Sequence, residues 1–250
     1  MDDAPIHWFE RIASTQDTAH QLAAEGAAGG TAVAAVEQTA GRGSRGRPWS
    51  SPRGGLWLSV ICRPPGGPAT EVLSLRAALA AASVLEGAGV PGVRIKWPND
   101  LMLGERKLGG ILCEARWTGD QLGWIVIGLG INVQNAPAGG LRDTAVSLAA
   151  AGSPLRAGDL VTPMTAALRR AGSLVGALDP AERLAFAARD WLAGRTLAAP
   201  VAGTADGVTE AGALRIRAPG AVVHMARTGP VVVAGPSTLQ IGRASCRERV

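Results

Sequence analysis

A glycine- and arginine-rich loop at residues 41–49, GRGSRGRPW, carries side chains suited to binding a small anion. Glycine adopts positive φ freely, so three glycines allow several backbone N–H groups to converge on one ligand. Arg42, Arg45 and Arg47 add guanidinium groups that bind phosphate or carboxylate through paired hydrogen bonds, and Trp49 can stack on a purine. A solvated loop and an RNA-binding tract are the alternatives, although the loop is short and has no aromatic repeat.

The KWPND segment at residues 96–100 brings a second set of polar side chains to the end of an expected strand. Pro98 breaks that strand, and the turn presents Lys96, Asn99 and Asp100. Lysine is a compact charge that can contact a phosphate, and a carboxylate oxygen such as that of Asp100 can bind Mg²⁺. The alternative is an Asx-type turn in which Asp100 only caps backbone amides.

Two further motifs place glycines inside expected strands. RKLGGIL at residues 106–112 is followed by Glu114, and GLGIN at residues 128–132 ends on Asn132. Glycine weakens a strand interior, so its presence there indicates close approach of a ligand. Glu114 is either an acid that supports the site or a surface carboxylate. Asn132 either reads a polar edge of the ligand or only ends its strand.

Lysine is rare in this chain, and its positions point to the same motifs. Of 25 lysines and arginines only Lys96 and Lys107 are lysines, and they lie within one stretch of the sequence. A coding bias toward arginine explains the general pattern but not the survival of these two. A contact with phosphate or carboxylate that requires a compact charge does explain it.

Length and composition predict a folded chain with a substantial core. The 250 residues have a mass of 25.4 kDa, with 47% hydrophobic and 18% charged residues, which excludes general disorder. No apolar run approaches the roughly 18 residues of a membrane span, and the first residues lack the apolar segment of a secretory signal. Cys62, Cys113 and Cys246 are too few and too scattered for a disulfide scaffold or a zinc site. We expect a cytoplasmic protein without a membrane partner.

Part of the net charge of +5 comes from the last twelve residues of the sequence. Residues 239–250 contain three arginines and one glutamate, have no strand or helix periodicity, and read like a non-native tail. The charge of the rest is too low for a general nucleic-acid surface. A local anion site is compatible with it.

Hydrophobic periodicity predicts elements in an order typical of an α+β fold rather than of alternating βαβ units. The expected strands cover residues 6–9, 31–37, 56–62, 93–97, 101–103, 108–117 and 122–131. The expected helices cover about 14–23, 70–87, 158–178 and 180–192. We expect a main domain at 1–193, a small β domain at 194–238 that packs on it, and the tail at 239–250.

Taken together, the motifs resemble those of biotin protein ligases. GRGSRGRPW, KWPND, RKLGGIL with its glutamate, and GLGIN occur in the order and spacing of that family, and the Ser-Thr-Gln segment at 14–16 matches its biotin segment. The resemblance is close from about residue 14 to 132 and holds in outline beyond. It implies a catalytic domain like that of class II aminoacyl-tRNA synthetases, a mixed sheet flanked by helices, followed by a shortened SH3-like β domain.

The resemblance also implies a reaction. Members of the family join biotin to ATP to give biotinyl-5′-AMP, and then pass the biotinyl group to one lysine of a biotin carboxyl carrier domain of a biotin-dependent carboxylase. ATP and Mg²⁺ are the expected cofactors. A carboxylate must attack an α-phosphate, so fixed positive charge has to neutralise two anions and hold them in line.

Roles for individual residues follow from the resemblance alone. The residues that it assigns to biotin are Ser14, Thr15, Gln16, Gln38, Arg42, Gly43, Ser44, Lys107, Gly110, Gly128 and Gly130. Those that it assigns to ATP are Arg45, Arg47, Trp49, Lys96, Asn99 and Asn132. The catalytic set is Lys107, Arg42, Lys96 and Asp100, with Asp100 also the candidate metal ligand and a candidate to orient the acceptor amine.

Departures from the family pattern qualify these expectations. Ser44 stands where many members have arginine, in the loop that retains the reactive adenylate. The main domain begins close to residue 1, without the winged helix of members that are repressors, so we expect no DNA binding. The sequence leaves open whether two subunits pair. The loop at 41–49 is expected to be mobile without ligand and to become ordered when the adenylate forms.

Two other functions remain to be distinguished from the biotin ligase. A lipoate or octanoate ligase or transferase shares this kind of catalytic fold, but those families do not combine GRGxxGRxW with KWPND. A biotin-sensing regulator without catalytic activity would bind biotin without releasing pyrophosphate.

Overall fold

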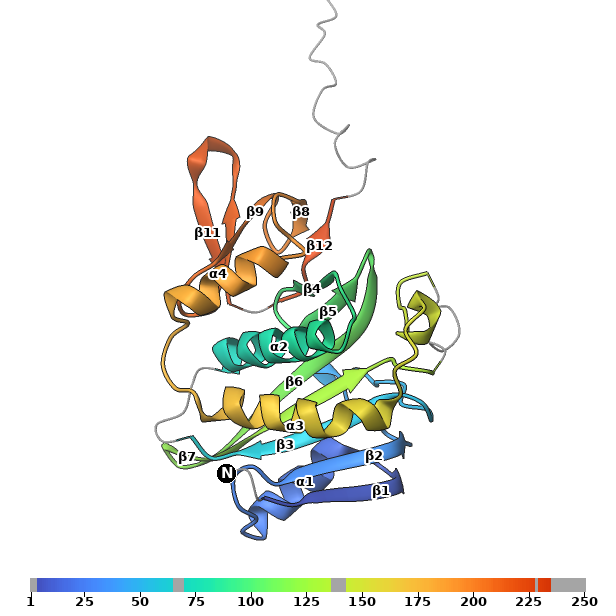
Figure 1. Cartoon of the computed structure of the whole chain (residues 1–250). Coiled ribbons are helices and arrows are strands. Elements are labelled where there is room, and N and C mark those ends of the chain that lie inside the picture. The colour runs from blue at the N-terminus through green and yellow to red at the C-terminus, as the bar shows by residue number, and fades with distance from the viewer. Residues whose placement is uncertain (1–3, 65–69, 136–142, 228, 235–250) are drawn as a thin grey trace, which may run out of the picture.

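Two β-sheets and four α-helices make up the described part of the chain, residues 4–64, 70–135, 143–227 and 229–234, in a computed structural model (Figure 1). The strands of the larger sheet are β1 (Ile6–Ile12), β2 (Ala32–Gln38), β3 (Leu56–Cys62), β4 (Val93–Lys96), β5 (Asp100–Leu103), β6 (Arg106–Thr118) and β7 (Gln121–Ile131). They lie in the order β1-β2-β3-β7-β6-β5-β4. Only β1 and β2 run parallel, and the other neighbours are antiparallel. The predicted α+β class with a mixed sheet is confirmed.

The helices cover both faces of the larger sheet. They are α1 (Thr15–Ala24), α2 (Thr70–Gly87), α3 (Ala157–Ser173) and α4 (Pro180–Arg189). Alternate residues of a strand face opposite sides, and Val33 and Ile61 pack in one apolar cluster with Ala19 and Ala23 of α1. Their neighbours along β2 and β3 belong to the other cluster, with α2 and α3. The helix α1 therefore lies on one face, and α2 and α3 lie on the other (Figure 1).

Two helices are shorter than their periodicity predicts. The helix expected at 158–178 ends at Ser173, and Gly176, with φ of 75°, turns the chain soon afterwards. The helix expected at 180–192 ends at Arg189, because Asp190 adopts extended backbone and pairs with Ile95 beside β4. The second expectation was too long because Trp191 and Leu192, which follow α4, pack into the core without helical geometry. The first was too long because the apolar residues Leu174 and Val175 continue the pattern past α3, although they are exposed.

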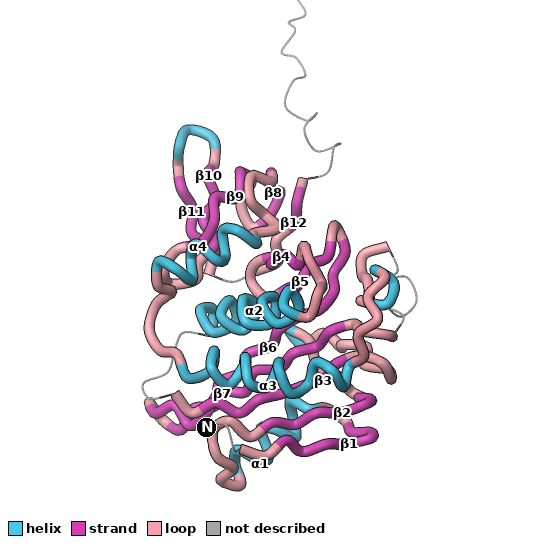
Figure 2. The backbone as a smooth tube through the Cα atoms, in the orientation of Figure 1, coloured by secondary structure: helices cyan, strands magenta, loops and turns pink. Residues whose placement is uncertain are grey.

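The smaller sheet stands beyond β4 and α4, at the end of the molecule far from β1 (Figure 2). Its strands are β8 (Thr196–Ala199), β9 (Gly203–Val208), β10 (Leu214–Arg217), β11 (Val223–Ala226) and β12 (Val232–Val233), in the order β11-β10-β9-β8-β12. Its inward side chains join the apolar cluster of the larger sheet. A hydrogen bond from Trp97 Nε1 to the carbonyl oxygen of Gly212, 2.8 Å long, fastens the two sheets together.

Three further expectations concern the tail, the cysteines and the absence of a membrane span. The proposed tail at 239–250 lies outside the described residues, as does Cys246. Cys62 and Cys113 are free thiols. Among the described residues, every helix is too short or too polar to cross a bilayer.

Candidate functional site

A cavity of about 640 Å³ lies where the ends of several strands, the start of α1 and the loop at 41–49 meet. The predicted site residues that line it are Ser14, Thr15, Gln16, Gln38, Arg42, Gly43, Ser44, Arg47, Trp49, Lys96, Asn99, Asp100, Lys107, Gly110, Gly128, Gly130 and Asn132. Arg45 does not line the cavity. It is exposed, with φ of 61°. The four motifs are thus brought together, and of the residues assigned to the ligands only Arg45 lies apart.

One wall of the cavity is a buried polar network at the start of α1. Ser14 caps the helix by accepting a hydrogen bond from the backbone of Asp17. Gln38 Oε1 accepts hydrogen bonds from the backbone N–H of Thr15, at 2.7 Å, and from its hydroxyl, at 3.0 Å. The hydroxyl of Ser59 lies 3.0 Å from Thr15 Oγ1. These fixed donors and acceptors can read a polar heterocycle, because buried polar groups discriminate strongly against ligands that leave them unpaired.

Ser59 is a residue of this wall that sequence reasoning missed. It lies in the middle of the apolar strand β3 and is fully buried. Its hydroxyl contacts Thr15 and also Gln16, at 3.1 Å from Oε1. A lone serine within a run of buried apolar residues is the signal that could have found it, because a buried hydroxyl needs a partner.

The strand glycines accommodate side chains of the protein itself in this structure. A Cβ at Gly128 would lie 2.5 Å from Gln16 Oε1, and one at Gly130 would lie 2.7 Å from Trp49 Nε1. The sequence predicted that a ligand approaches the strand closely at these glycines. In the structure the side chains of Gln16 and Trp49 occupy that position. The indole N–H of Trp49 is buried and has no hydrogen-bond acceptor among the described residues.

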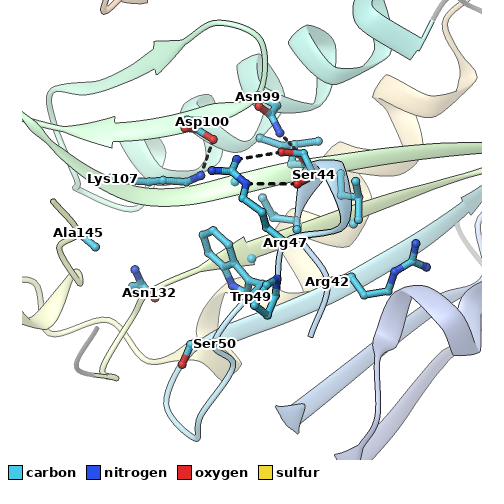
Figure 3. A pocket seen from close by; sticks show the side chains of 18 of the residues that line it. Arg42, Ser44, Arg47, Trp49, Ser50, Asn99, Asp100, Lys107, Asn132 and Ala145 are labelled. Atoms are coloured by element: carbon cyan, nitrogen blue, oxygen red, sulfur yellow. Dashed lines mark hydrogen bonds and ion pairs between the residues drawn. The ribbon is translucent and has the colours of Figure 1, made fainter. Parts of the chain in front are cut away.

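Lys107 lines the cavity, and its side chain points toward Asp100 (Figure 3). Its Nζ is 2.6 Å from Asp100 Oδ1 and 5.0 Å from the centre of the Trp49 ring. Antiparallel pairing places Lys107 of β6 opposite Met102 of β5, two residues from Asp100, with a register shift after Leu101. The ammonium group is therefore held in place but remains at the cavity wall.

The two predicted asparagines of the site are anchored by hydrogen bonds, Asn99 to the backbone and Asn132 to the backbone and to Asn135, which also lines the cavity. Asn99 Nδ2 donates to the carbonyl oxygen of Ile111, at 2.7 Å. Asn132 Oδ1 accepts from Asn135 Nδ2, at 2.9 Å, and Asn132 Nδ2 donates to a backbone carbonyl. Both side chains brace turns next to the cavity, which is a scaffolding role that the sequence did not separate from ligand binding.

Lys96 lies at the end of the cavity nearest the smaller sheet. Its Nζ is 5.2 Å from the centre of the Trp191 ring, and the guanidinium of Arg195 stacks on the same ring at 3.7 Å. Burial lowers the pKa of Lys96 from its ordinary value, opposed by the charge of Asp100 and reinforced by the positive charges of Lys107 and Arg195. Positive charge is concentrated here, and an anionic ligand would stabilise the charged form of Lys96.

Arg42 bridges the loop to α1 and β6. Its guanidinium lies 2.5 Å from Asp17 Oδ1 and 2.7 Å from Glu114 Oε1. The other oxygen of Glu114 accepts a hydrogen bond from Gln16, at 3.1 Å. The nearby imidazole of His20, then the hydrogen bond from Gln16 and the charge of Arg42, lower the pKa of Glu114 to about 2 against the effect of burial. Glu114 is thus an acid that supports the site and not merely a surface carboxylate.

The loop at 41–49 is closed by its own hydrogen bonds. The N–H of Gly43 donates to the carbonyl of Arg47, and the N–H of Trp49 donates to that of Gly41, both at 2.8 Å. Arg47 contacts Ser44 at 3.4 Å (Figure 3). Ordering of this loop by ligand stays a prediction.

The description "Biotin/lipoate A/B protein ligase family" belongs to a family model that matches residues 8–132, half of the chain. The chain belongs to this family. The sequence is 42% identical over 149 residues to the "Bifunctional ligase/repressor BirA" of Bacillus subtilis, covering 58% of this chain and 46% of that protein. It is 42% identical over 133 residues to the "Biotin--[acetyl-CoA-carboxylase] ligase" of Paracoccus denitrificans, covering 52% and 55% of the two chains. These matches span about half the length of the curated relatives.

Solved structures extend the likeness in fold over most of the chain. A biotin protein ligase from Aquifex aeolicus in complex with biotin and ATP matches with a TM-score of 0.77 and 24% identity, covering 92% of this chain and 98% of that one. A biotin protein ligase from Leishmania major in complex with biotinyl-5-AMP matches with a TM-score of 0.61 and 28% identity, covering 89% and 98%. The fold class is therefore that of biotin protein ligases, including the smaller sheet.

Proposed function

We propose that this protein is a biotin–protein ligase, which activates biotin as biotinyl-5′-AMP with ATP and transfers the biotinyl group to a lysine of a biotin carboxyl carrier domain. The observation that carries the proposal is the polarity of one cavity. A network of neutral donors and acceptors lies on one wall and two lysines lie on another. That arrangement suits a ligand with a neutral polar ring and a carboxylate that must meet a phosphate.

The polar wall holds the neutral end of the acid substrate. Ser14, Thr15, Gln16 and Gln38 would surround the biotin ring, with Ser59 added by the structure. The glycines at 128 and 130 let Gln16 and Trp49 pack closely against the strand at the floor of the cavity. A lipoyl or octanoyl chain would leave these buried groups unpaired, which favours biotin over the alternative substrates.

Lys107 would neutralise the two reacting anions. Its ammonium is paired with Asp100 in this structure. When a carboxylate and an α-phosphate bind, the ammonium would leave Asp100 and pair with these two anions. Positioned charge of this kind is the main requirement for attack of a carboxylate on phosphorus. Lys96 would stabilise the remaining phosphates. The indole N–H of Trp49 would donate to the nucleotide, and Asn99 and Asn132 would keep the adjoining turns in place.

Asp100 fits the role of Mg²⁺ ligand. Mg²⁺ is held in enzymes of this kind by one or two carboxylates and by the phosphates of the substrate, so a dedicated cluster of acids is not needed. No cluster of three or more metal-binding side chains occurs in the part of the chain that the structure describes. When bound, the ion would offset phosphate charge. In the transfer step, the acceptor amine would attack the carbonyl carbon of the adenylate and AMP would leave, and Asp100 would orient the amine.

The test is pyrophosphate release from the purified protein with Mg-ATP and biotin, with and without a biotin-acceptor domain, and with lipoate in place of biotin. Biotin-dependent release that turns over only with the acceptor domain is the expected result. Release with lipoate would assign the chain to the other branch of its family. Biotin binding without pyrophosphate release would make it a sensor.

A further inference from the structure

Arg42 is fastened on the side of the cavity away from the reacting groups. It points away from Lys107 and Asp100 (Figure 3), toward carboxylates on two different elements. Asp17, on α1, is more than half exposed, whereas Glu114, on β6, is 20% exposed. Asp17 is the nearer partner, but Glu114 is the anchor that other side chains of the fold can hold in one position for the loop at 41–49.

Behind Glu114 lies a pair of residues that no motif contains. The side chain of His20 is 9% exposed, and its Nε2 lies 3.4 Å from Glu114 Oε2. The indole N–H of Trp124 donates to His20 Nδ1, at 2.9 Å. Trp124 is on β7 and packs with α1 on the same face of the sheet.

The Trp124 contact determines which nitrogen of His20 carries the proton. Indole nitrogen is only a donor, so His20 Nδ1 must be the acceptor and must be unprotonated. The proton of the neutral imidazole is then on Nε2. Nε2 is buried and has no hydrogen bond of good geometry among the described residues, so the nearby Glu114 carboxylate is the group toward which its N–H can turn.

We propose that His20 is a positioning residue for the loop at 41–49, with its tautomer set by Trp124. Together with Gln16, which donates to the same oxygen, it fixes Oε2 of Glu114, so that Oε1 holds Arg42 and the loop stays in place over the cavity. A carboxylate has about four acceptor positions, and without His20 only Gln16 restrains its rotation away from the guanidinium. The effect of this network on adenylate retention rests on the proposed function; the network itself does not.

Two measurements test the network without any substrate. In long-range ¹H–¹⁵N spectra, His20 should show the Nε2–H tautomer, and Trp124→Phe, which removes the donor, should give a mixture of tautomers. Trypsin can cleave after Arg42 only when the guanidinium leaves its carboxylates. Cleavage after Arg42, counted by mass spectrometry relative to cleavage after the unanchored Arg45, should rise roughly tenfold in His20→Leu, the size expected for loss of one charge-assisted hydrogen bond.

Variants separate positioning from simple stability. His20→Gln retains an N–H donor and should restore most of the protection of Arg42. His224→Leu, at an exposed position on β11, is the matched control and should change nothing. Because His20 is buried, thermal unfolding is recorded for each variant, and Trp124→Phe provides a second variant that keeps His20 in place. An Nδ1–H tautomer in the wild type, or equal cleavage after Arg42 in all variants, would overturn the proposal.

The enzymatic measurement comes last. If biotin-dependent pyrophosphate release is present, His20→Leu should raise the KM for biotin and the acceptor-independent release of pyrophosphate several-fold with little change in kcat. A fall in kcat with unchanged KM would contradict a positioning role. Absence of biotin-dependent release in the wild type would refute the proposed function. The tautomer and cleavage measurements would still test the network of Trp124, His20, Glu114 and Arg42.

Discussion

Lys107 is the residue on which the proposed chemistry depends most. Its ammonium lies between the carboxylate of Asp100 and the face of Trp49. Both partners suit a compact charge that can move by a small distance. A guanidinium is larger and planar, and cannot occupy the same position without displacing one of them.

We expect Lys107→Arg to lose activity roughly hundredfold, comparable with removal of one positioned donor to a developing anion. The measurement is kcat/KM for biotin-dependent pyrophosphate release. Arg106→Lys, at the exposed neighbouring position, is the control and should be close to wild type. Near-normal turnover of Lys107→Arg would show that the scarcity of lysine has no chemical meaning here.

Ser44 carries a second prediction at this scale. It lines the cavity next to Arg47, where many family members have a further cation. Ser44→Arg should hold the anionic adenylate more tightly, because it adds a guanidinium at the cavity wall. Pyrophosphate release without acceptor should then fall several-fold, while release with acceptor persists. An unchanged ratio between the two rates would mean that Arg47 already supplies the needed charge.

The sequence located the site residues better than it explained them. Motif spacing placed Lys107, Asp100 and Arg42 at one cavity, because each motif is a local pattern. It did not identify Ser59, His20 or Trp124, whose partners lie 43 to 104 residues away along the chain. Such contacts depend on which faces of α1 and β7 meet, and no local pattern encodes that.

At the scale of elements, the strand glycines make room for specific side chains. Gly128→Ala should displace Gln16 from β7, because the new methyl carbon would lie 2.5 Å from its Oε1. Loss of the link from Gln16 to Glu114 and Ser59 should raise the KM for biotin at least several-fold. Gly123→Ala, where the nearest atom is 3.3 Å away, is the control in the same strand. Equal kinetics for the two variants would contradict the tight packing inferred at Gly128.

The residue that follows α4 makes stability depend on pH. Burial raises the pKa of Asp190 to about 6, opposed by a hydrogen bond from the backbone of Leu192 and by the charge of Arg94. The native state therefore binds this proton more tightly than the unfolded chain does. Stability from this group is full below its unfolded pKa of 3.8 and is lost as pH rises through 6.

Asp190→Asn should be more stable than the wild type at pH 8 by roughly 2–3 kcal/mol, because the amide oxygen can still accept from Leu192 without a buried charge. Urea unfolding at pH 4 and pH 8 measures the difference, which should nearly vanish at pH 4. Asp120→Asn, in an exposed turn, serves as control. If the difference in free energy of unfolding between variant and wild type is the same at pH 4 and pH 8, the raised pKa assigned to Asp190 is wrong.

The whole molecule raises the question of where one domain ends. We propose the boundary at about residue 193, before β8, as composition indicated. The smaller sheet nevertheless shares its core with the larger one: Leu197, Leu214 and Ile216 belong to the main apolar cluster. A unit of this size has too little core of its own to fold alone.

Thermal unfolding of the full chain should therefore show a single transition, with the two sheets melting together. A chain that ends at residue 193 should lose several degrees of Tm, because it exposes the apolar face that the smaller sheet covers. Calorimetry of both chains measures this. Two separate transitions in the full chain would show that the sheets fold independently.

At this scale the sequence predicted the class of fold but not its arrangement. Periodicity located most strands of the larger sheet and the start of each helix. It could not give the order β1-β2-β3-β7-β6-β5-β4, in which the last two strands along the chain lie in the middle. Helix ends were overestimated at α3 and α4, because apolar residues continue past the last turn of each helix.

The hydrogen bond from Trp97 to Gly212 connects the smaller sheet to the KWPND turn, which belongs to the larger sheet. Lys96 and Asn99 lie on either side of Trp97 in the KWPND segment, and both line the cavity. Under the proposed function, proteolytic cleavage beyond residue 193, or a substitution in the Gly212 turn, would therefore weaken binding of the nucleotide. The cause would lie outside the cavity, because the described residues that line it end at Trp191.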